Sequence, residues 1–237
     1  MSEVVESVAK KAKLEEAEEA DAGEVVLHGY WRSSCSWRVR TALELKKIKY
    51  TYKAVHLVEG AQLSEEYSKL NAMRQVPTLV IDGLVLTQSV AILEYLEETR
   101  PTPALMPKDP KLRAIGRRMV EIINAGIQPV QNFAVLKEIT KLGGDKMEWS
   151  RLAIEHGFKA LEREAAAVPG RDEDYYMLTK EVTFADILLV PQVYNANRFS
   201  VDMTQFPILS KVNEKLEQLE AFKASHASAQ PDAVAPA

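Results

Sequence analysis

The chain has 237 residues, of which 46% are hydrophobic, and its 30 basic and 34 acidic side chains give a net charge of −4. A chain of this length forms one large domain or two smaller ones. The near-neutral balance argues against nucleic acid as a partner, because a phosphate backbone requires a positive surface. No run approaches the roughly 18 consecutive apolar residues of a membrane span. The single cysteine, Cys35, excludes an internal disulfide framework, and the four histidines have no metal-ligand spacing, so no metal is assigned.

The two ends differ in composition from the rest of the chain. Residues 1–23 hold seven acidic side chains against three lysines, without the apolar core of a secretion signal or the arginines of a transit peptide. We expect a flexible acidic extension here, with a partner-binding arm as the alternative. The small residues and two prolines of residues 225–237 predict a flexible tail. We expect a cytoplasmic protein, with a mitochondrial location as the alternative.

The first half of the remaining chain alternates between strand and helix patterns. Short apolar and β-branched runs predict strands at 25–28, 50–55, 77–81 and 84–86, and helical spacing predicts helices at 39–45, 61–70 and 90–98. Asp82-Gly83 is a strong signal for a hairpin turn between the last two strands. Ser89 is a good N-cap for the helix that follows them. The order βαβαββα predicts a mixed sheet covered by helices.

The second half has almost no strand pattern. Four prolines within residues 101–110 mark a linker, which we place at residues 104–110. Helical patterns follow at 111–138, 148–168, 184–197 and 208–223. The sequence therefore predicts an α/β domain at residues 24–103 and an all-helical domain at residues 111–224.

The residues with the clearest chemistry lie between the first strand and the first helix. Ser33, Ser34 and Ser36 surround Cys35 there. A helix start presents free backbone N–H groups and a partial positive charge, and it binds anions. Lowering a thiol pKa by about two units from ~8.5 requires roughly 2.7 kcal/mol, which the helix dipole and one or two hydrogen bonds can supply. The site can stabilise a thiolate, either that of Cys35 or one brought by a ligand; the alternative is a serine N-cap beside an inert cysteine.

Two further pairs of residues point to a small peptide ligand. Val76-Pro77 begins a predicted strand, where proline removes a ladder donor. A cis bond there would turn the Val76 backbone outward to pair with an extended peptide, and the alternative is an ordinary strand-entry proline. Gln88-Ser89 offers an amide, a hydroxyl and a second helix start, which suit a carboxylate, although a plain N-cap would look the same. Together these residues describe a groove for a peptide that carries a thiol and a carboxylate.

The stretch Ser33-Ser34-Cys35-Ser36-Trp37-Arg38-Val39-Arg40 resembles the signature of the zeta-class glutathione transferases, also called maleylacetoacetate isomerases. The resemblance extends from about residue 24 to 231 and includes the segments 71–79, 88–89, 94–103, 127–132, 190–193 and 195–199. It implies a thioredoxin-like N-terminal domain that binds glutathione, an all-helical glutathione-transferase C-terminal domain with the substrate site, and a homodimer.

The resemblance also implies a reaction. Glutathione would serve as cofactor for the cis–trans isomerisation of maleylacetoacetate, a small molecule, to fumarylacetoacetate in phenylalanine and tyrosine catabolism. The thiolate would add to the cis double bond, the resulting single bond would rotate, and elimination would give the trans isomer. The alternatives are a transferase that conjugates α-haloacids to glutathione, and a non-catalytic scaffold that binds glutathione.

The same resemblance assigns roles to individual residues. It implies that Ser33, Ser34 and Cys35 are catalytic, with Ser33 the direct partner of the glutathione sulfur. Substrate carboxylates would be held by Arg32 and Arg198. Glutathione would be bound by Ser33, Ser34, Cys35, Ser36, Trp37, Arg38, Gln62, Val76, Gln88, Ser89, Gln128 and Asn132. Thr183 and Asp186 resemble the helix-capping pair of this superfamily, so Asp186 is expected to support folding instead of catalysis.

Overall fold

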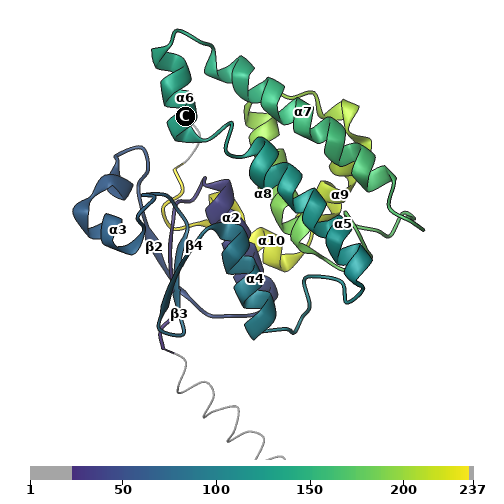
Figure 1. The fold of residues 1–237 in the computed structure, drawn as a ribbon, viewed down its shortest axis with the longest axis horizontal. Coiled ribbons are helices and arrows are strands. Elements are labelled where there is room, and N and C mark those ends of the chain that lie inside the picture. Colours follow the sequence, from purple (N-terminus) through teal and green to yellow (C-terminus); the bar gives the residue numbers. More distant parts are fainter. Residues whose placement is uncertain (1–22, 235–237) are drawn as a thin grey trace, which may run out of the picture.

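A four-stranded sheet forms the centre of the first domain in the structure, a computed structural model that describes residues 23–234 (Figure 1). Its strands are β1 (Val26–Gly29), β2 (Thr51–Ala54), β3 (Thr78–Ile81) and β4 (Leu84–Thr87), in the spatial order β2-β1-β3-β4. β1 pairs in parallel with β2 and antiparallel with β3, and β3 pairs antiparallel with β4. The predicted mixed sheet is confirmed.

Three helices complete the thioredoxin-like domain in the predicted βαβαββα order. They are α2 (Ser34–Leu45), α3 (Glu65–Leu70), which follows a short 3₁₀ turn, and α4 (Ser89–Thr99). Asp82 and Gly83 both have positive φ angles, of 52° and 72°. A type I′ hairpin requires that conformation at its two central residues, so the predicted turn between β3 and β4 is confirmed.

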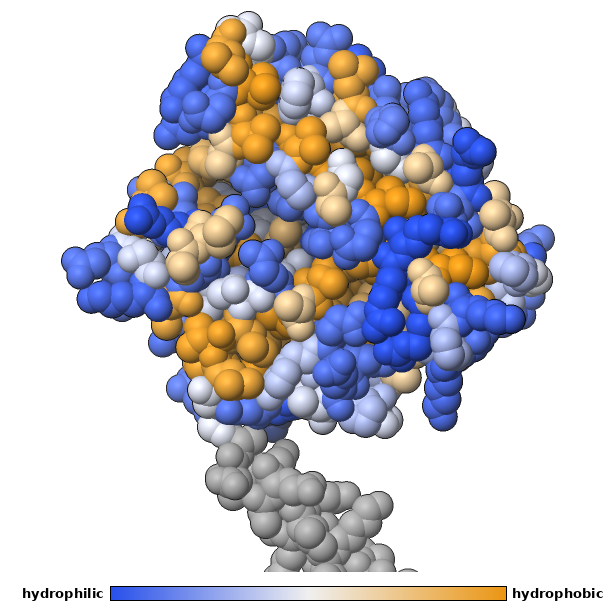
Figure 2. Space-filling model, viewed as in Figure 1, coloured by the Kyte–Doolittle hydropathy of each residue, from blue (hydrophilic) through white to orange (hydrophobic). Residues whose placement is uncertain are grey.

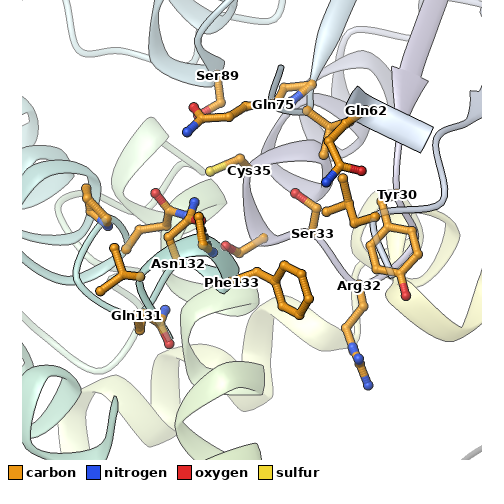
Figure 3. A pocket seen from close by; sticks show the side chains of 18 of the residues that line it. Tyr30, Arg32, Ser33, Cys35, Gln62, Gln75, Ser89, Gln131, Asn132 and Phe133 are labelled. Atoms are coloured by element: carbon orange, nitrogen blue, oxygen red, sulfur yellow. Dashed lines mark hydrogen bonds between the residues drawn. The ribbon is translucent and has the colours of Figure 1, made fainter. Parts of the chain in front are cut away.

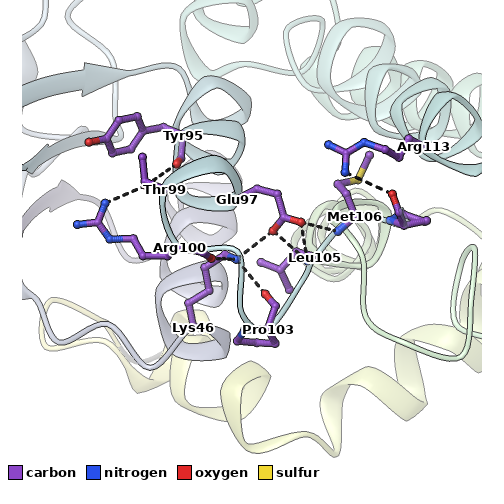
Figure 4. A network of polar contacts seen from close by, with 10 residues as sticks. Lys46, Tyr95, Glu97, Thr99, Arg100, Pro103, Leu105, Met106 and Arg113 are labelled. Atoms are coloured by element: carbon purple, nitrogen blue, oxygen red, sulfur yellow. Dashed lines mark hydrogen bonds and ion pairs between the residues drawn. The ribbon is translucent and has the colours of Figure 1, made fainter. Parts of the chain in front are cut away.

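A buried polar network fixes the junction between the domains (Figure 4). The Glu97 carboxylate accepts the backbone N–H groups of Leu105 and Met106 at 3.0–3.1 Å and pairs with Lys46 Nζ at 2.9 Å. The ammonium group also donates to two carbonyls of the junction, and Leu105 and Met106 are themselves buried. Both charges are hydrogen-bonded on several sides. They therefore hold the start of the predicted linker, at Leu105 and Met106, in a defined position between the two domains.

The second domain is all-helical, as predicted, but two predicted helices, at 111–138 and 208–223, are each divided. A single helix at residues 111–138 is wrong: α5 (Pro110–Glu121) continues into a π-helical turn, Ile122–Ile127, and then stops. Pro129 lacks the N–H that a continuing helix needs, so the chain breaks before the next helix begins. The remaining helices are α6 (Phe133–Lys141), α7 (Lys146–Ala166), α8 (Phe184–Arg198), α9 (Pro207–Glu217) and α10 (Glu220–Ser225).

Helix α8 runs through the centre of this domain and begins at a buried carboxylate. Asp186 is fully buried and accepts the backbone N–H groups of Thr183 and Met177, each at 2.7 Å, and also the Thr183 hydroxyl. Burial raises the pKa of Asp186 to about 6. These contacts are those of a helix cap and agree with the predicted folding role. Helix α2 packs against α4 in its own domain and against α8 and α10 of the second domain (Figure 1).

The end of the described chain is packed against the first domain. A flexible tail was expected from residue 225, but Ser225 is buried, and Asp232 reaches back to the β1–α2 loop. Its carboxylate accepts the Trp31 N–H at 3.0 Å and the Tyr52 hydroxyl at 3.3 Å. These contacts correct the prediction for residues 225–234. The acidic extension at residues 1–22 and the last three residues of the tail lie outside the described residues.

Two sequence-based expectations concern absences. Within residues 23–234, no helix is both long and apolar enough to span a bilayer. In the same part of the chain, no three His, Cys, Asp or Glu side chains are grouped as metal ligands would be.

Candidate active site

A cleft of about 700 Å³ lies between the two domains. The loop from β1 to α2, the entry to β3 and the start of α4 line one side, and the π-helical turn, α6 and the end of α8 line the other. In the close view, Ser33, Cys35 and Gln62 come from the first domain, and Asn132 and Phe133 face them from the second (Figure 3). Most of the residues that the sequence singled out line this cleft: Arg32, Ser33, Ser34, Cys35, Gln62, Val76, Gln88, Ser89, Gln128, Asn132 and Arg198.

Ser33 caps helix α2 and keeps a proton to donate. Its backbone is extended, and its side-chain oxygen accepts the Ser36 N–H at 3.2 Å. A hydroxyl that already accepts a hydrogen bond still has its own proton, and accepting one strengthens it as a donor. Ser34 and Cys35 are the first two residues of α2, where backbone N–H groups have no partner inside the helix. A hydroxyl donor and the positive end of a helix thus meet at one point of the cleft.

The middle of the first-domain wall offers groups that suit a peptide backbone. The Val76–Pro77 bond is cis, as predicted, and both residues line the cleft. Gln62 faces the same space (Figure 3). Its carbonyl oxygen Oε1 is buried and has no hydrogen-bond partner among residues 23–234. Buried acceptors are nearly always paired, so the Gln62 amide is a candidate for a ligand contact.

The start of α4 differs from the prediction in a way that affects the site. Ser89, expected to be the N-cap, is the first residue of the helix, and Gln88 occupies the cap position without a side-chain capping bond. Gln88 has a φ of 69°, a conformation that costs a non-glycine residue about 1–3 kcal/mol. The Ser89 hydroxyl accepts a hydrogen bond from Arg38 Nη1 at 3.1 Å. Both residues line the cleft, and Ser89 is held there by a buried cation.

Ser36, Trp37 and Arg38 do not line the cleft. All three are buried, at 0–1% exposure, in the first turns of α2. The Ser36 hydroxyl accepts the Tyr30 N–H, and the Trp37 ring packs edge-on against two aromatic rings of the second domain and the C-terminal segment. Their side chains point inward because this part of the helix is covered by the second domain. The expectation that they contact glutathione directly is therefore corrected for these side chains.

The second-domain wall follows from the break between α5 and α6. In the π-helical turn, Gln128 donates its N–H to the carbonyl of Ile123, five residues back, at 2.9 Å. Four residues later, Asn132 caps α6 by accepting the Ala134 N–H at 3.0 Å. Single π-helical turns are frequent at functional sites, because they change which residues of a helix face a cavity. Here the turn and the break bring Gln128 and Asn132 to the cleft.

One end of the cleft is positively charged. Arg32 lies over the Trp31 ring at 5.2 Å, and Arg198 donates to Asn195 Oδ1 at 3.1 Å. Partial burial and the charge of Arg32 lower the pKa of Arg198. Within residues 23–234 neither guanidinium forms an ion pair with a carboxylate. Two like charges without a counter-ion make this end suited to a ligand with carboxylates.

Sequence reasoning missed two residues of the cleft that the geometry brings forward. Phe133 is 54% exposed and lies across the cleft from Ser33 (Figure 3). The segment 127–132, which resembles the family, ends one residue before Phe133. The available signal in the sequence was an aromatic residue directly after that segment. Asn124 lines the cleft and binds Arg38, but its orientation depends on the π-helical turn, which leaves no mark in the hydrophobic pattern.

Comparisons with known proteins agree with this geometry. Residues 32–99 match the family model for the glutathione S-transferase N-terminal domain. The maleylacetoacetate isomerase of Dictyostelium discoideum is 52% identical over 213 residues, which cover 88% of this chain and 95% of that protein. The holo structure of a maleyl pyruvate isomerase, a bacterial zeta-class glutathione S-transferase, has a TM-score of 0.85 and 38% identity, covering 88% of this chain and all of that one. The maleylacetoacetate isomerase structure from Anaeromyxobacter dehalogenans, with dicarboxyethyl glutathione and citrate in its active site, has a TM-score of 0.80 and 42% identity, covering 90% and 95%.

A thioredoxin-like domain that matches the glutathione S-transferase model, a helical domain and a cleft between them define a glutathione transferase. At the start of helix α2, a serine pair and a cysteine line this cleft. With about half of its residues shared with a curated relative along nearly the whole length, the chain belongs to the zeta class, the maleylacetoacetate isomerase family.

Proposed function

We propose that this protein catalyses the glutathione-dependent cis–trans isomerisation of maleylacetoacetate to fumarylacetoacetate, a step in phenylalanine and tyrosine catabolism. The observation that carries the proposal is the hydroxyl of Ser33 at the start of α2, free to donate into a cleft that Arg32 and Arg198 also line. The relatives named above support the same reaction class.

The groups in the cleft fit the functional groups of glutathione. Ser33, Ser34 and Cys35 surround the place for the thiol, and the Gln62 amide can bind the peptide backbone. The Val76 backbone can pair with the peptide, while Gln88 and Ser89 suit the γ-glutamyl carboxylate. Gln128 and Asn132 close the site from the second domain. A volume of about 700 Å³ lies within the ~300–1,000 Å³ range of small-molecule sites.

Ser33 has the central role in this proposal. When bound, glutathione supplies a thiolate that adds to the cis double bond and leaves after rotation about the resulting single bond, so the tripeptide is regenerated. The Ser33 hydroxyl donates a hydrogen bond to the sulfur and thereby favours the thiolate form. The start of α2 adds the field of the helix dipole. Ser34 and Cys35 assist as neighbouring donors.

Arg32 and Arg198 hold the substrate. Maleylacetoacetate carries a carboxylate at each end, and these two guanidinium groups lie at one end of the cleft without an acidic partner among the described residues. A bound carboxylate would relieve the repulsion between them. The relative that contains dicarboxyethyl glutathione shows that a zeta-class cleft accepts a glutathione derivative with additional carboxylates.

The test is an isomerisation assay with maleylacetone, a simpler analogue of the substrate. The recombinant protein should isomerise it only when glutathione is present, and equal rates without glutathione would refute the proposal. Comparing specificity constants for maleylacetone and dichloroacetate separates isomerisation from haloacid conjugation. A non-catalytic scaffold would bind glutathione without turnover of either compound.

The role of Cys35 is tested in the same assay. Replacing Ser33 with alanine should slow turnover more than replacing Cys35 with alanine, because the nucleophile belongs to the bound tripeptide. Loss of all activity in Cys35→Ala alone, with Ser33→Ala active, would make the protein thiol the nucleophile.

The proposal includes a homodimer. On the face drawn in Figure 2, apolar side chains gather over the β3–β4 hairpin, where Leu84 and Val85 remain 46% and 48% exposed. Exposed apolar patches commonly mark protein interfaces. Light scattering after size-exclusion chromatography should give twice the mass of the chain, and the mass of one chain would contradict the homodimer.

A further inference from the structure

Arg38 is a buried cation without a carboxylate partner. The residue is 1% exposed, and no carboxylate of residues 23–234 forms an ion pair with it. Its Nε and Nη2 atoms are buried and have no hydrogen-bond partner within this part of the chain. Burial lowers the pKa of Arg38, and the nearby Cys35 thiol and Glu121 carboxylate act in the opposite direction. A buried charge left this poorly compensated is costly, so its retention calls for an explanation.

The one nitrogen of Arg38 that has partners contacts two residues of the cleft. Nη1 donates to the Ser89 hydroxyl at 3.1 Å and to Asn124 Oδ1 at 3.0 Å. Arginine has no acceptor, so the Ser89 oxygen must accept in this contact. The hydroxyl proton of Ser89 is therefore directed away from Arg38. Since Ser89 lines the cleft, this proton can be donated to a ligand there. Arg38 therefore turns Ser89 into a donor toward any ligand at the start of α4.

The contact with Asn124 links this arrangement to the second domain. Asn124 belongs to the π-helical turn, and its amide nitrogen faces the Glu121 carboxylate at 3.4–3.5 Å while its oxygen faces Arg38. Both neighbours require the same orientation of the amide, with oxygen toward the cation and nitrogen toward the anion. The guanidinium is consequently held from both domains, beneath the floor of the cleft and out of reach of a ligand.

From these contacts we propose that Arg38 is a positioning residue for the anionic end of the bound tripeptide: it fixes the Ser89 hydroxyl as a donor, and the γ-glutamyl carboxylate that Ser89 binds adds a negative charge near a cation that forms no ion pair within residues 23–234. The inference rests on the proposed function, since it takes glutathione as the ligand and the start of α4 as the place of its γ-glutamyl end. It assigns to Arg38 an action through Ser89 instead of a direct contact.

The test compares two peptides in calorimetric titrations. Glutathione carries the γ-glutamyl carboxylate, and 4-aminobutyryl-cysteinyl-glycine is the same peptide without that carboxylate. Wild-type protein should bind glutathione more tightly by about tenfold or more, the scale of a hydrogen bond to a charged group. In Arg38→Gln this ratio should fall to about threefold or less, through weaker binding of glutathione alone. Ser89→Ala should lower the ratio too, and the double variant no further, because both residues act in one contact.

Matched variants separate positioning from a general effect on structure. Arg163→Gln removes an exposed arginine on α7, away from the cleft, and should keep the wild-type ratio. Arg38→Lys keeps the charge but not the planar fork, and should give an intermediate ratio. An unchanged ratio in Arg38→Gln, or an equal loss of affinity for both peptides, would overturn the proposal.

If Arg38→Gln does not fold, as judged by circular dichroism, two milder variants decide the question. Arg38→Lys and Asn124→Ala leave a cation in place but loosen its geometry, and both should lower the ratio. Wild-type ratios in both variants would overturn the role of Arg38. Maleylacetone turnover by the wild-type protein is measured in parallel: turnover with an unchanged ratio overturns only the role of Arg38, whereas binding without turnover overturns only the isomerase function.

Discussion

Arg38 and Arg40 lie two residues apart on α2, and their surroundings differ although both are almost fully buried, at 1% and 0% exposure. Arg40 uses Nε and both terminal nitrogens to bind backbone carbonyls of Ser225, Tyr30 and Trp31, at 2.9–3.4 Å. Arg38 binds only side chains of the cleft, through a single nitrogen. One cation faces the C-terminal segment and the β1–α2 loop, and the other faces the floor of the cleft.

The difference separates two uses of a buried charge. Arg40 is the one donor within residues 23–234 to the carbonyls of Ser225 and Trp31, and it ties the end of α10 to the loop that precedes Ser33. Burial lowers its pKa to about 10, so it remains charged at neutral pH. Around Arg38, by contrast, Nε and Nη2 have no hydrogen-bond partner among residues 23–234. Buried polar groups are rarely left unpaired, and such exceptions are good places to look for function. We therefore expect Arg40 to serve folding and Arg38 to serve binding.

The largest effect is expected for stability when Arg40 is replaced. Arg40→Met leaves the carbonyls of Ser225 and Trp31 without a donor and should lower the free energy of unfolding by about 3–5 kcal/mol. Arg38→Met removes a buried charge that has no ion-pair partner, and this gain offsets part of the cost of the lost hydrogen bonds. The loss in the free energy of unfolding should therefore be clearly smaller than for Arg40→Met. Urea denaturation measures both. Equal losses of unfolding free energy in Arg40→Met and Arg38→Met would contradict the assignment of a folding role to Arg40 alone.

A second effect tests whether the Arg40 region reaches the active site. Asp232 holds the Trp31 N–H, next to Arg32, from the C-terminal segment. Asp232→Ala should lower the free energy of unfolding by about 2 kcal/mol. It should also raise KM for maleylacetone by about threefold, because ordering Arg32 would then cost binding energy. Glu214→Ala, which removes an exposed carboxylate of α9, is the control. An unchanged KM would confine Asp232 to a structural role.

The smallest stability effect should appear in the response to ligand. Glutathione at a fixed saturating concentration L stabilises the folded protein by RT ln(1 + L/Kd), so a threefold weaker Kd reduces that gain by about 0.7 kcal/mol. Arg38→Gln should show this reduction. Arg40→Lys should start from a lower melting temperature and yet gain as much from glutathione as the wild type. Thermal melts with and without glutathione measure this gain for each variant. A full gain in Arg38→Gln together with a reduced gain in Arg40→Lys would contradict the assignment of Arg38 to binding and Arg40 to folding.

Features with a local cause were predictable from the sequence. The order of strands and helices, the Asp82-Gly83 hairpin and the cis bond before Pro77 each depend on a few neighbouring residues. The serine pair and Cys35 at the start of α2 also belong to a single short segment, so the thiol end of the cleft was visible as a motif.

Features that depend on distant contacts were not predictable in this way. The π-helical turn before Gln128 interrupts a continuous hydrophobic pattern, and the docking of Asp232 depends on a loop some 200 residues earlier in the chain. The inward positions of Trp37 and Arg38 follow from the packing of the second domain on α2. Within one motif, the sequence could not separate residues that face the cleft from residues that lie beneath it.

The most direct measurement is an ultraviolet titration of the thiol of bound glutathione. The thiolate absorbs ultraviolet light that the thiol does not absorb. The absorbance therefore reports the pKa of the thiol of bound glutathione without any turnover of substrate. In wild-type protein it should lie about two units below the free value of ~8.5, and Ser33→Ala should raise it by about one unit or more. A bound thiol that titrates at the free value, or the same pKa in both proteins, would contradict the stabilisation of a thiolate by Ser33 at the start of α2.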